Sequence, residues 1–385
     1  MNSLLLIFTR LRYFAPAWVF ASLNIMVGTW VLYIPYVKNK LEIDDAQLGI
    51  ALFCFALGTL TMIPMTSKIS NAIGIGKATM VGILSLSVFF LFPIIASSYL
   101  ILCVMLFLTG TVVCLTDVSM NALVSEIEQE DEVHFMSASH GFFSLGGVIG
   151  AGIGSLIITF FEIPLMHMIS ASIFVIISNL LLVKSYLKID GKQGEREKKS
   201  FQISLLKPLL GLTVISFLIM GSEGAIEHWS KLYLKEVVIV TSEKLSGFGF
   251  VTFSAMMTLG RFFGDQISKK FGPLKIIIGG SLIGALGFLA ILMSEFYITV
   301  FGFGMVGLGY SVIVPELFRL AGKAKGVSTA EGISFVAGFG YVGFLLSPAF
   351  MGFLSKIGTL KLSFTALLTA AGIVILTALY LQKRK

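Results

Sequence analysis

The chain has 385 residues, of which 56% are hydrophobic and only 13% are charged, and its formal net charge is +7. Soluble domains have about 25% charged and about 45–50% apolar residues, so this composition excludes an ordinary soluble protein. The basic residues fall between apolar runs and form no patch interleaved with aromatics, which argues against a nucleic-acid partner.

Apolar runs longer than about 18 residues recur along the whole chain, and each is a candidate membrane helix. We therefore predict an all-α integral membrane protein, most simply a monomer, in contact with the lipid bilayer. Twelve spans are expected, at residues 13–37, 46–70, 76–97, 99–127, 135–160, 164–187, 205–236, 243–268, 274–294, 296–321, 326–355 and 359–381. The polar link at 188–201 divides them into an N-terminal six-helix bundle (1–187), a cytoplasmic linker (188–203) and a C-terminal six-helix bundle (204–385).

The lysines and arginines of the links predict the orientation. If the N-terminus is cytoplasmic, 21 of the 28 basic residues lie on the cytoplasmic side. This count assigns Arg261 to a cytoplasmic link and Lys231 to the opposite side. We therefore expect an inner-membrane protein with both termini in the cytoplasm. The three cysteines lie inside apolar runs and suggest no metal site. No cofactor is expected, apart from a proton as coupling ion.

The two halves resemble each other in sequence. The segment Gly74-Ile-Gly-Lys77 recurs as Gly272-Pro-Leu-Lys275 at an offset of 198, and spans five and eleven both carry runs of glycine. Small residues at such spacing let helices approach closely. Two parallel six-helix repeats predict the architecture of the major facilitator transporters, with a substrate site at the membrane midplane between the halves.

An aspartate inside the fourth span is the strongest candidate for function. An ionisable group within a membrane span is costly, and Asp117 has no basic residue near it in sequence. Asn121 lies four residues later, on the same helix face. Asp117 is interpreted either as a proton-coupling carboxylate oriented by Asn121 or as part of a structural hydrogen bond. His140, in span five, could titrate or bind substrate, or could serve as an interhelical donor.

Span seven carries a second polar group. Glu223 and Glu227 share one helix face, where they would repel each other unless one is protonated or a cation lies nearby. His228 and Trp229 follow, and either an outer vestibule or an interfacial position at the headgroups would suit them. Glu316 and Arg319 look like a local ion pair. Candidate cavity-lining residues are Asn24, Trp30, Tyr33, Ser144, Tyr310 and Tyr341.

The link between spans eight and nine carries a recognisable motif. The segment Gly264-Asp265-Gln-Ile-Ser-Lys269-Lys270-Phe-Gly272 resembles the loop signature of the major facilitator family, in which these residues hold a cytoplasmic gate. The first-half copy is degenerate, with Ser67 where the aspartate would be. The resemblance therefore implies a single strong gate motif.

Further segments resemble a bacterial, loosely sugar-transporter-like subgroup of that family, the YbjJ-like proteins. They are Asp117-Val-Ser-Met-Asn121, the segment from Ser139 to Gly147, the segment from Glu223 to Leu234, and Gly340-Tyr341-Val-Gly343 with Pro348. The chain departs from the subgroup at His228, where an aspartate is usual, so a proton or substrate role at that position is altered.

These observations favour a secondary transporter that moves a small polar organic solute by alternating access, coupled to protons. The alternative is a proton-driven exporter of drugs or metabolites on the same fold. No nucleotide-binding motif occurs in the sequence, and neither His-Glu-x-x-His nor Gly-x-Ser-x-Gly does, which argues against an ATP-driven pump and against an enzyme.

Overall fold

The structure, a computed structural model, describes residues 3–133, 135–190, 206–324 and 329–383, although the side chains of some helical residues in these ranges are not described. Every regular element in these ranges is helical. Eleven of the described helical segments are long and apolar enough to cross a membrane. The remaining predicted span, 243–268, corresponds mainly to α13 (Phe248–Phe271), in which the side chains of residues 263–270 are not described. The predicted all-α membrane fold is confirmed.

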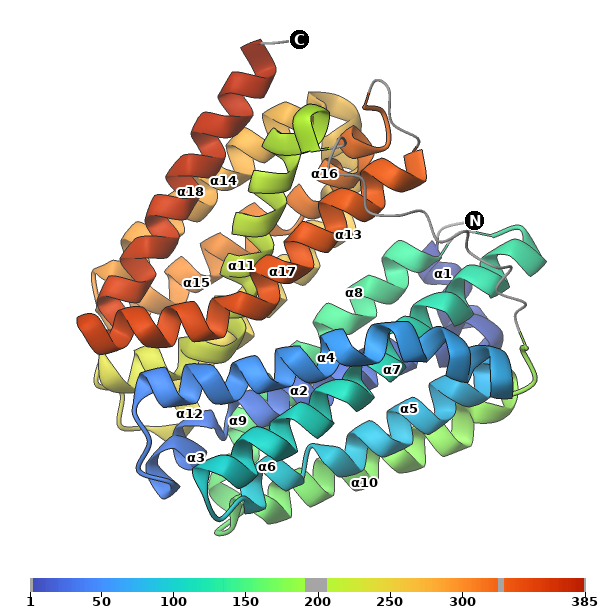
Figure 1. The fold of residues 1–385 in the computed structure, drawn as a ribbon, viewed down its shortest axis with the longest axis horizontal. Helices are drawn as coiled ribbons and strands as arrows, with labels where there is room; N and C mark the ends of the chain where they lie inside the picture. The colour runs from blue at the N-terminus through green and yellow to red at the C-terminus, as the bar shows by residue number, and fades with distance from the viewer. Residues whose placement is uncertain (1–2, 134, 191–205, 325–328, 384–385) are drawn as a thin grey trace. The chain divides into compact units, whose positions relative to one another are not determined.

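The chain divides into two compact units, Met1–Ile43 with Ile50–Arg196, and Asp44–Gly49 with Glu197–Lys385. The first unit contains α1 (Ser3–Thr9), α2 (Leu11–Val31), α3 (Ile34–Lys40), most of α4 (Asp45–Ile73), α5 (Ile75–Phe89), α6 (Phe92–Ile95), α7 (Tyr99–Asp131), α8 (Met136–Gly147), a π-helical segment (Val148–Ile153), α9 (Gly154–Ile157) and α10 (Pro164–Leu182). Within this unit, α5 runs beside α7 and α10 (Figure 1). The predicted linker falls mostly on residues 191–205, outside the described part of the chain.

The second unit contains the beginning of α4, then α11 (Leu206–Glu236), α12 (Glu243–Ser246), α13, α14 (Pro273–Leu292), α15 (Phe296–Tyr310), α16 (Ile313–Ala321), α17 (Thr329–Ile357) and α18 (Leu360–Lys383). Helix α17 packs along α11, and α18 lies beside α14 (Figure 1). The buried aromatic side chains of Tyr233, Phe303 and Phe364 join α11, α15 and α18.

Glycines allow helices to pack closely in both units. A Cβ at Gly146 of α8 would lie 2.1 Å from the carbonyl oxygen of Ala21 on α2. In the second unit, a Cβ at Gly343 of α17 would lie 2.2 Å from the carbonyl oxygen of Phe217 on α11. A Cβ at either position would collide with the backbone of the neighbouring helix, so Gly146 and Gly343 are points where helix backbones touch.

The repeat at an offset of 198 is also visible in the backbone. Gly74 precedes α5 with φ 89° and ψ 148°, and Gly272 precedes α14 with φ 78° and ψ 159°. Positive φ angles favour glycine because it lacks a Cβ. The two halves therefore use the same left-handed turn between equivalent helices.

Several predicted spans are interrupted, including those at 296–321, 13–37 and 135–160. The span at 296–321 breaks between α15 and α16, because Pro315 has no N–H for the carbonyl of Ser311 and its ring crowds that turn. The span at 13–37 forms two helices: α2, which ends at Val31, and α3, which begins at Ile34. The span at 135–160 contains the π-helical segment Val148–Ile153, rich in glycine, and π segments of this kind often occur at functional sites.

The start of α4 is a capping box. The backbone N–H of Gln47 donates to Asp44 Oδ1 at 2.8 Å, and Gln47 Oε1 accepts from the backbone N–H of Asp44 at 2.9 Å. Within the same unit, Lys356 Nζ lies 2.9 Å from Asp44 Oδ2. The Gln47 N–H, and then Lys356, hold the pKa of Asp44 below its ordinary value of 3.8.

We expect Asp44→Ala to lower the free energy of unfolding by about 1 kcal/mol, because it removes an N-cap. A depressed native pKa contributes stability above the unfolded value, and this contribution is lost as the pH falls through the native value. The difference between wild type and Asp44→Ala should therefore be constant above pH 5 and shrink below 3.8. Thermal unfolding from pH 3 to pH 7 measures it, and a difference that grows in acid would contradict this account.

Candidate functional site

Asp117 lies on α7 in the first unit and is partly buried. The side-chain amide of Asn121 donates to the Asp117 backbone carbonyl at 2.8 Å and to Asp117 Oδ1 at 3.3 Å. Helical spacing of four produces this contact, as the sequence indicated. Asn121 thus orients the carboxylate, while the amide carries no charge that would neutralise it.

Acidic residues at the end of α7, namely Glu128, Glu130 and Asp131, have a structural role. Arg12, at the start of α2, contacts Asp131 at 2.6 Å and Glu130 at 2.5 Å. Glu128 Oε1 accepts from the backbone N–H groups of Phe135 and Met136 at the start of α8. These contacts tie the end of α7 to α2 and α8. Spacing in the sequence does not reveal this role of Arg12, because its partners lie more than a hundred residues away.

His140 on α8 is exposed, and the edge of its ring meets the ring of Phe20 with centroids 5.1 Å apart. Ser144 is buried, and its hydroxyl donates to the His140 carbonyl at 3.5 Å. Asn24 on α2 donates to the Phe143 carbonyl at 2.9 Å, while its Oδ1 is buried without a hydrogen-bond partner among the described residues. Asn24 is therefore the predicted lining residue of this unit with a spare acceptor.

Trp30, near the end of α2, and Tyr33, just before α3, are both buried. The Tyr33 hydroxyl lies 2.7 Å from Nδ1 of His167 on α10, and the His167 ring stacks on Phe161 at 4.9 Å. Tyr33 is thus engaged in a buried contact between helices. No sequence pattern marks His167, because it lies 134 residues from Tyr33 and only folding brings the two together.

In the second unit, Glu223 on α11 has its Oε1 buried with no hydrogen-bond partner among the described residues. Arg261 on α13 lies close enough to interact with Glu223 electrostatically. The buried Tyr310 hydroxyl of α15 lies beside Ser222 and Glu223. Three helices therefore converge on one carboxylate.

Two expectations about this region need revision. Arg261 was counted as a link cation, but it lies inside α13, ten residues before the helix ends at Phe271. It is the cation that the pair of Glu223 and Glu227 was expected to need. Trp229 is fully buried, so an interfacial position at the headgroups is wrong. Its indole packs inside the unit.

Glu227 is partly buried and lies one turn after Glu223, which is its charged neighbour. His228 is buried, and its Nδ1 is 2.8 Å from the Gly224 carbonyl. Since a carbonyl can only accept, Nδ1 carries the proton there, and Nε2 is left as the second polar atom of the ring. His228 is thus anchored to its own helix.

Lys231 was expected on the outer side among the link cations, but its side chain is only 1% exposed. Its Nζ lies 3.1 Å from Glu243 on α12, and Lys235 also contacts Glu243. Burial alone would raise the pKa of Glu243, but Lys231 and Lys235 hold that pKa below its ordinary value. A charged cluster therefore closes the corner between α11 and α12.

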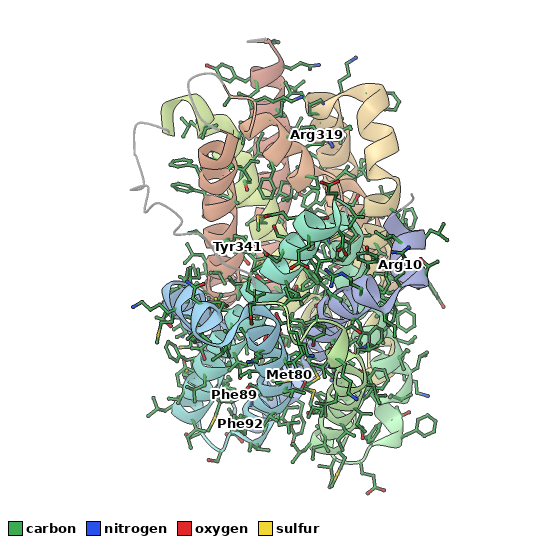
Figure 2. The ribbon with its side chains drawn as sticks, turned by 90° about the vertical axis from the view of Figure 1, so that its right-hand side faces the viewer. Arg10, Met80, Phe89, Phe92, Arg319 and Tyr341 are labelled. Carbon is green, nitrogen blue, oxygen red and sulfur yellow. The ribbon has the colours of Figure 1, made fainter. Side chains whose placement is uncertain are left out.

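Glu316 and Arg319 form the expected ion pair, at 2.9 Å, and Arg319 is labelled in Figure 2. Tyr341 on α17 is 52% exposed (Figure 2). The side chains of the predicted gate residues Gly264, Asp265, Lys269 and Lys270 lie outside the described residues. Gly272 is the one-residue break that follows α13.

A cavity of about 460 Å³ lies inside the second unit, between α11, α17 and α18. Its lining is almost entirely apolar and includes Phe217, Leu346 and Phe350. The hydroxyls of Ser222 and Ser347, which also line it, already donate to carbonyls of their own helices. The cavity therefore suits apolar rather than polar groups.

Two repeated helical units, with carboxylates inside membrane-spanning helices, define a secondary-transporter architecture. Residues 17–329 match the Major Facilitator Superfamily, and the chain belongs to that family. It is a multi-pass membrane transporter.

The chain is similar along most of its length to known relatives. It is 30% identical to the membrane protein MosC of Rhizobium meliloti, over 89% of this chain and 83% of that one. It is 27% identical to an uncharacterized MFS-type transporter of Yersinia pestis, over 92% and 90% of the two chains. The nucleoside transporter NupG has the same fold, with a TM-score of 0.74 at 12% identity over 97% and 99% of the chains.

Proposed function

We propose that this transporter moves a small polar organic solute across the inner membrane by alternating access, with protons as the coupling ion and both termini in the cytoplasm. We place it in the YbjJ-like subgroup on the motifs quoted above. One observation carries the proposal: Glu223 holds a buried carboxylate oxygen without a hydrogen-bond partner among the described residues, inside a membrane-spanning helix. Such a group is costly unless it binds something during function.

Protonation of Glu223 would remove its charge and weaken its attraction to Arg261. A change of this kind can couple proton binding to a rearrangement of α11 and α13. Asp117 offers a carboxylate in the other unit, and the side-chain amide of Asn121 orients it. A titratable group in each half supports proton coupling, because both can respond during one cycle.

The first test is a binding screen by thermal unfolding, using sugars, organic acids, amino acids, nucleosides and amphiphilic drugs at two pH values. A ligand at 100 times its Kd stabilises the native state by about 2.7 kcal/mol, a readily measured shift. We expect a hit among the small polar solutes, with the shift lost in Asp117→Asn or Glu223→Gln.

The second test is transport of that hit into proteoliposomes driven by a pH gradient. We expect each of the two variants to abolish gradient-driven accumulation. Glu132→Gln, which changes an exposed carboxylate just after α7, serves as the matched control and should transport normally. Undiminished accumulation in both Asp117→Asn and Glu223→Gln would show that coupling does not use these carboxylates.

The alternative, a proton-driven exporter of drugs or metabolites, is favoured by the apolar cavity between α11, α17 and α18. The same screen separates the two functions. Small shifts with many lipophilic cations, and none with polar solutes, would favour the exporter. Cells that produce an exporter should also accumulate less of an amphiphilic dye.

A further inference from the structure

Helix α11 carries charged residues at every fourth position, namely Glu223, Glu227, Lys231 and Lys235. Residues four apart lie near one another on a helix surface. Arg261 lies by Glu223 at one end of this row, and Glu243 contacts Lys231 and Lys235 at the other. The row therefore connects the corner at α12 with the buried carboxylate of the proposed coupling site.

Lys231 is the central member of the row. Its side chain is 1% exposed, whereas that of Glu243, 3.1 Å from its Nζ, is 45% exposed. A buried ammonium group strongly requires a nearby anion. Glu243, in contrast, is open enough to exchange protons with water. If Glu243 became neutral, Lys231 would need another carboxylate.

Glu227 is placed to be that carboxylate. It lies one helical turn before Lys231, and a glutamate four residues N-terminal to a lysine is the favourable order for an ion pair on a helix. Its present charged neighbour, Glu223, repels rather than stabilises an ionised Glu227. Lys231 therefore has a carboxylate on each side.

Other helices that pack against α11 also carry charged groups, and those among the described residues have the following partners or positions. Arg261 on α13 lies by Glu223, and Glu316 and Arg319 on α16 pair with each other. Lys356 on α17 pairs with Asp44, Lys244 lies next to Glu243 on α12, and Lys361 and Lys383 of α18 are exposed. Each of these cations thus has a partner of its own or lies at an exposed or terminal position.

We propose that Lys231 exchanges between Glu243 and Glu227 and so relays a proton along α11. A proton binds the Glu243 carboxylate, the Lys231 ammonium moves to Glu227, and protonated Glu227 releases its proton toward Glu223. One proton enters and one leaves, and Lys231 stays charged throughout. The relay rests on the proposed proton coupling and adds the route by which protons reach the coupling site.

A double-mutant cycle of thermal stability tests the exchange in the full chain without any substrate. If Glu227 can replace Glu243, Glu243→Gln and Glu227→Gln will each cost little, and the double variant will leave Lys231 with neither carboxylate. We expect the double variant to lose on the order of 5 °C more in Tm than the two single losses combined. The same cycle in a Lys231→Met background is the control and should be additive.

Additive losses in the wild-type background would overturn the relay. The contact of Lys231 with Glu243 would then be only a structural ion pair between α11 and α12. If the double variant does not fold, infrared spectroscopy of the single variants tests whether Lys231 moves to Glu227. The absorption of the protonated Glu227 carboxyl, assigned with Glu227→Gln, should be weaker in Glu243→Gln than in wild type at the same pH. It should be unchanged in Lys235→Met, and equal absorption in Glu243→Gln and wild type would refute the exchange.

These measurements use no transport assay, so their outcome is separable from that of the proposed function. An additive cycle together with coupled transport would remove the relay and retain the transporter proposal. A non-additive mutant cycle, together with transport that does not depend on the pH gradient, would retain the exchange of Lys231 and remove its role in proton coupling.

Discussion

Arg261→Gln is expected to lower the free energy of unfolding by roughly 1–3 kcal/mol, because it removes the cation that interacts electrostatically with Glu223, whose Oε1 is buried without a hydrogen-bond partner among the described residues. Thermal unfolding of the purified protein in detergent measures the loss. The effect follows from position: Glu223 lies inside a helix long and apolar enough to cross the membrane, where an uncompensated charge is costly.

A second substitution makes this prediction specific. Glu223→Gln removes the charge that would be stranded, so the double variant with Arg261→Gln should recover most of the lost stability. Lys356→Gln is the control: its side chain is 60% exposed and its pair with Asp44 should contribute at most about 1 kcal/mol. If the double variant is no more stable than Arg261→Gln alone, the arginine acts through packing rather than charge.

Gly343→Ala is expected to destabilise the second unit by about 1–3 kcal/mol. The new methyl group would lie 2.2 Å from the carbonyl oxygen of Phe217, so α17 and α11 would have to separate. The methyl carbon is fixed directly to the Cα of α17, and the oxygen belongs to the backbone of α11, so neither can move aside as the end of a flexible side chain can. Because α11 carries Glu223, we also expect weaker ligand binding in any assay that the screen makes available.

Gly338→Ala on the same helix is the matched control. Gly338 is exposed, and a Cβ there meets no atom within 4 Å. Alanine is the better helix former by roughly 0.5–1 kcal/mol, so this substitution should leave stability unchanged or raise it. Equal losses for the two variants would show that glycine at 343 is required for some reason other than close approach.

Sequence patterns predicted well where contacts are local. The contact of Asn121 with Asp117 and the ion pair of Glu316 with Arg319 follow from spacings of four and three on a helix. The offset of 198 between Gly74 and Gly272 predicted a repeated unit, and both glycines have the same left-handed backbone. Whether Asp117 and Glu223 carry protons remains a prediction.

Patterns failed where contacts join distant segments. Arg261 looked like a link cation because its neighbours in sequence belong to the gate motif, and only the packing of α13 against α11 brings it to Glu223. The burial of Trp229 and Lys231 was missed for the same reason. Hydropathy reports how apolar a helix is but not which side of it meets another helix.

The sequence by itself determined that this chain lies in a membrane, that it is helical and that it consists of two related halves. These properties depend on composition, helix length and repetition. The bilayer selects for apolar helical spans of sufficient length whatever their tertiary contacts are. Only the tertiary structure decided which charges are neighbours. Lys231 and Glu243 form an ion pair between two helices, and Arg261 interacts electrostatically with Glu223 from another helix, so these neighbours follow from the packing of helices rather than from spacing along the sequence.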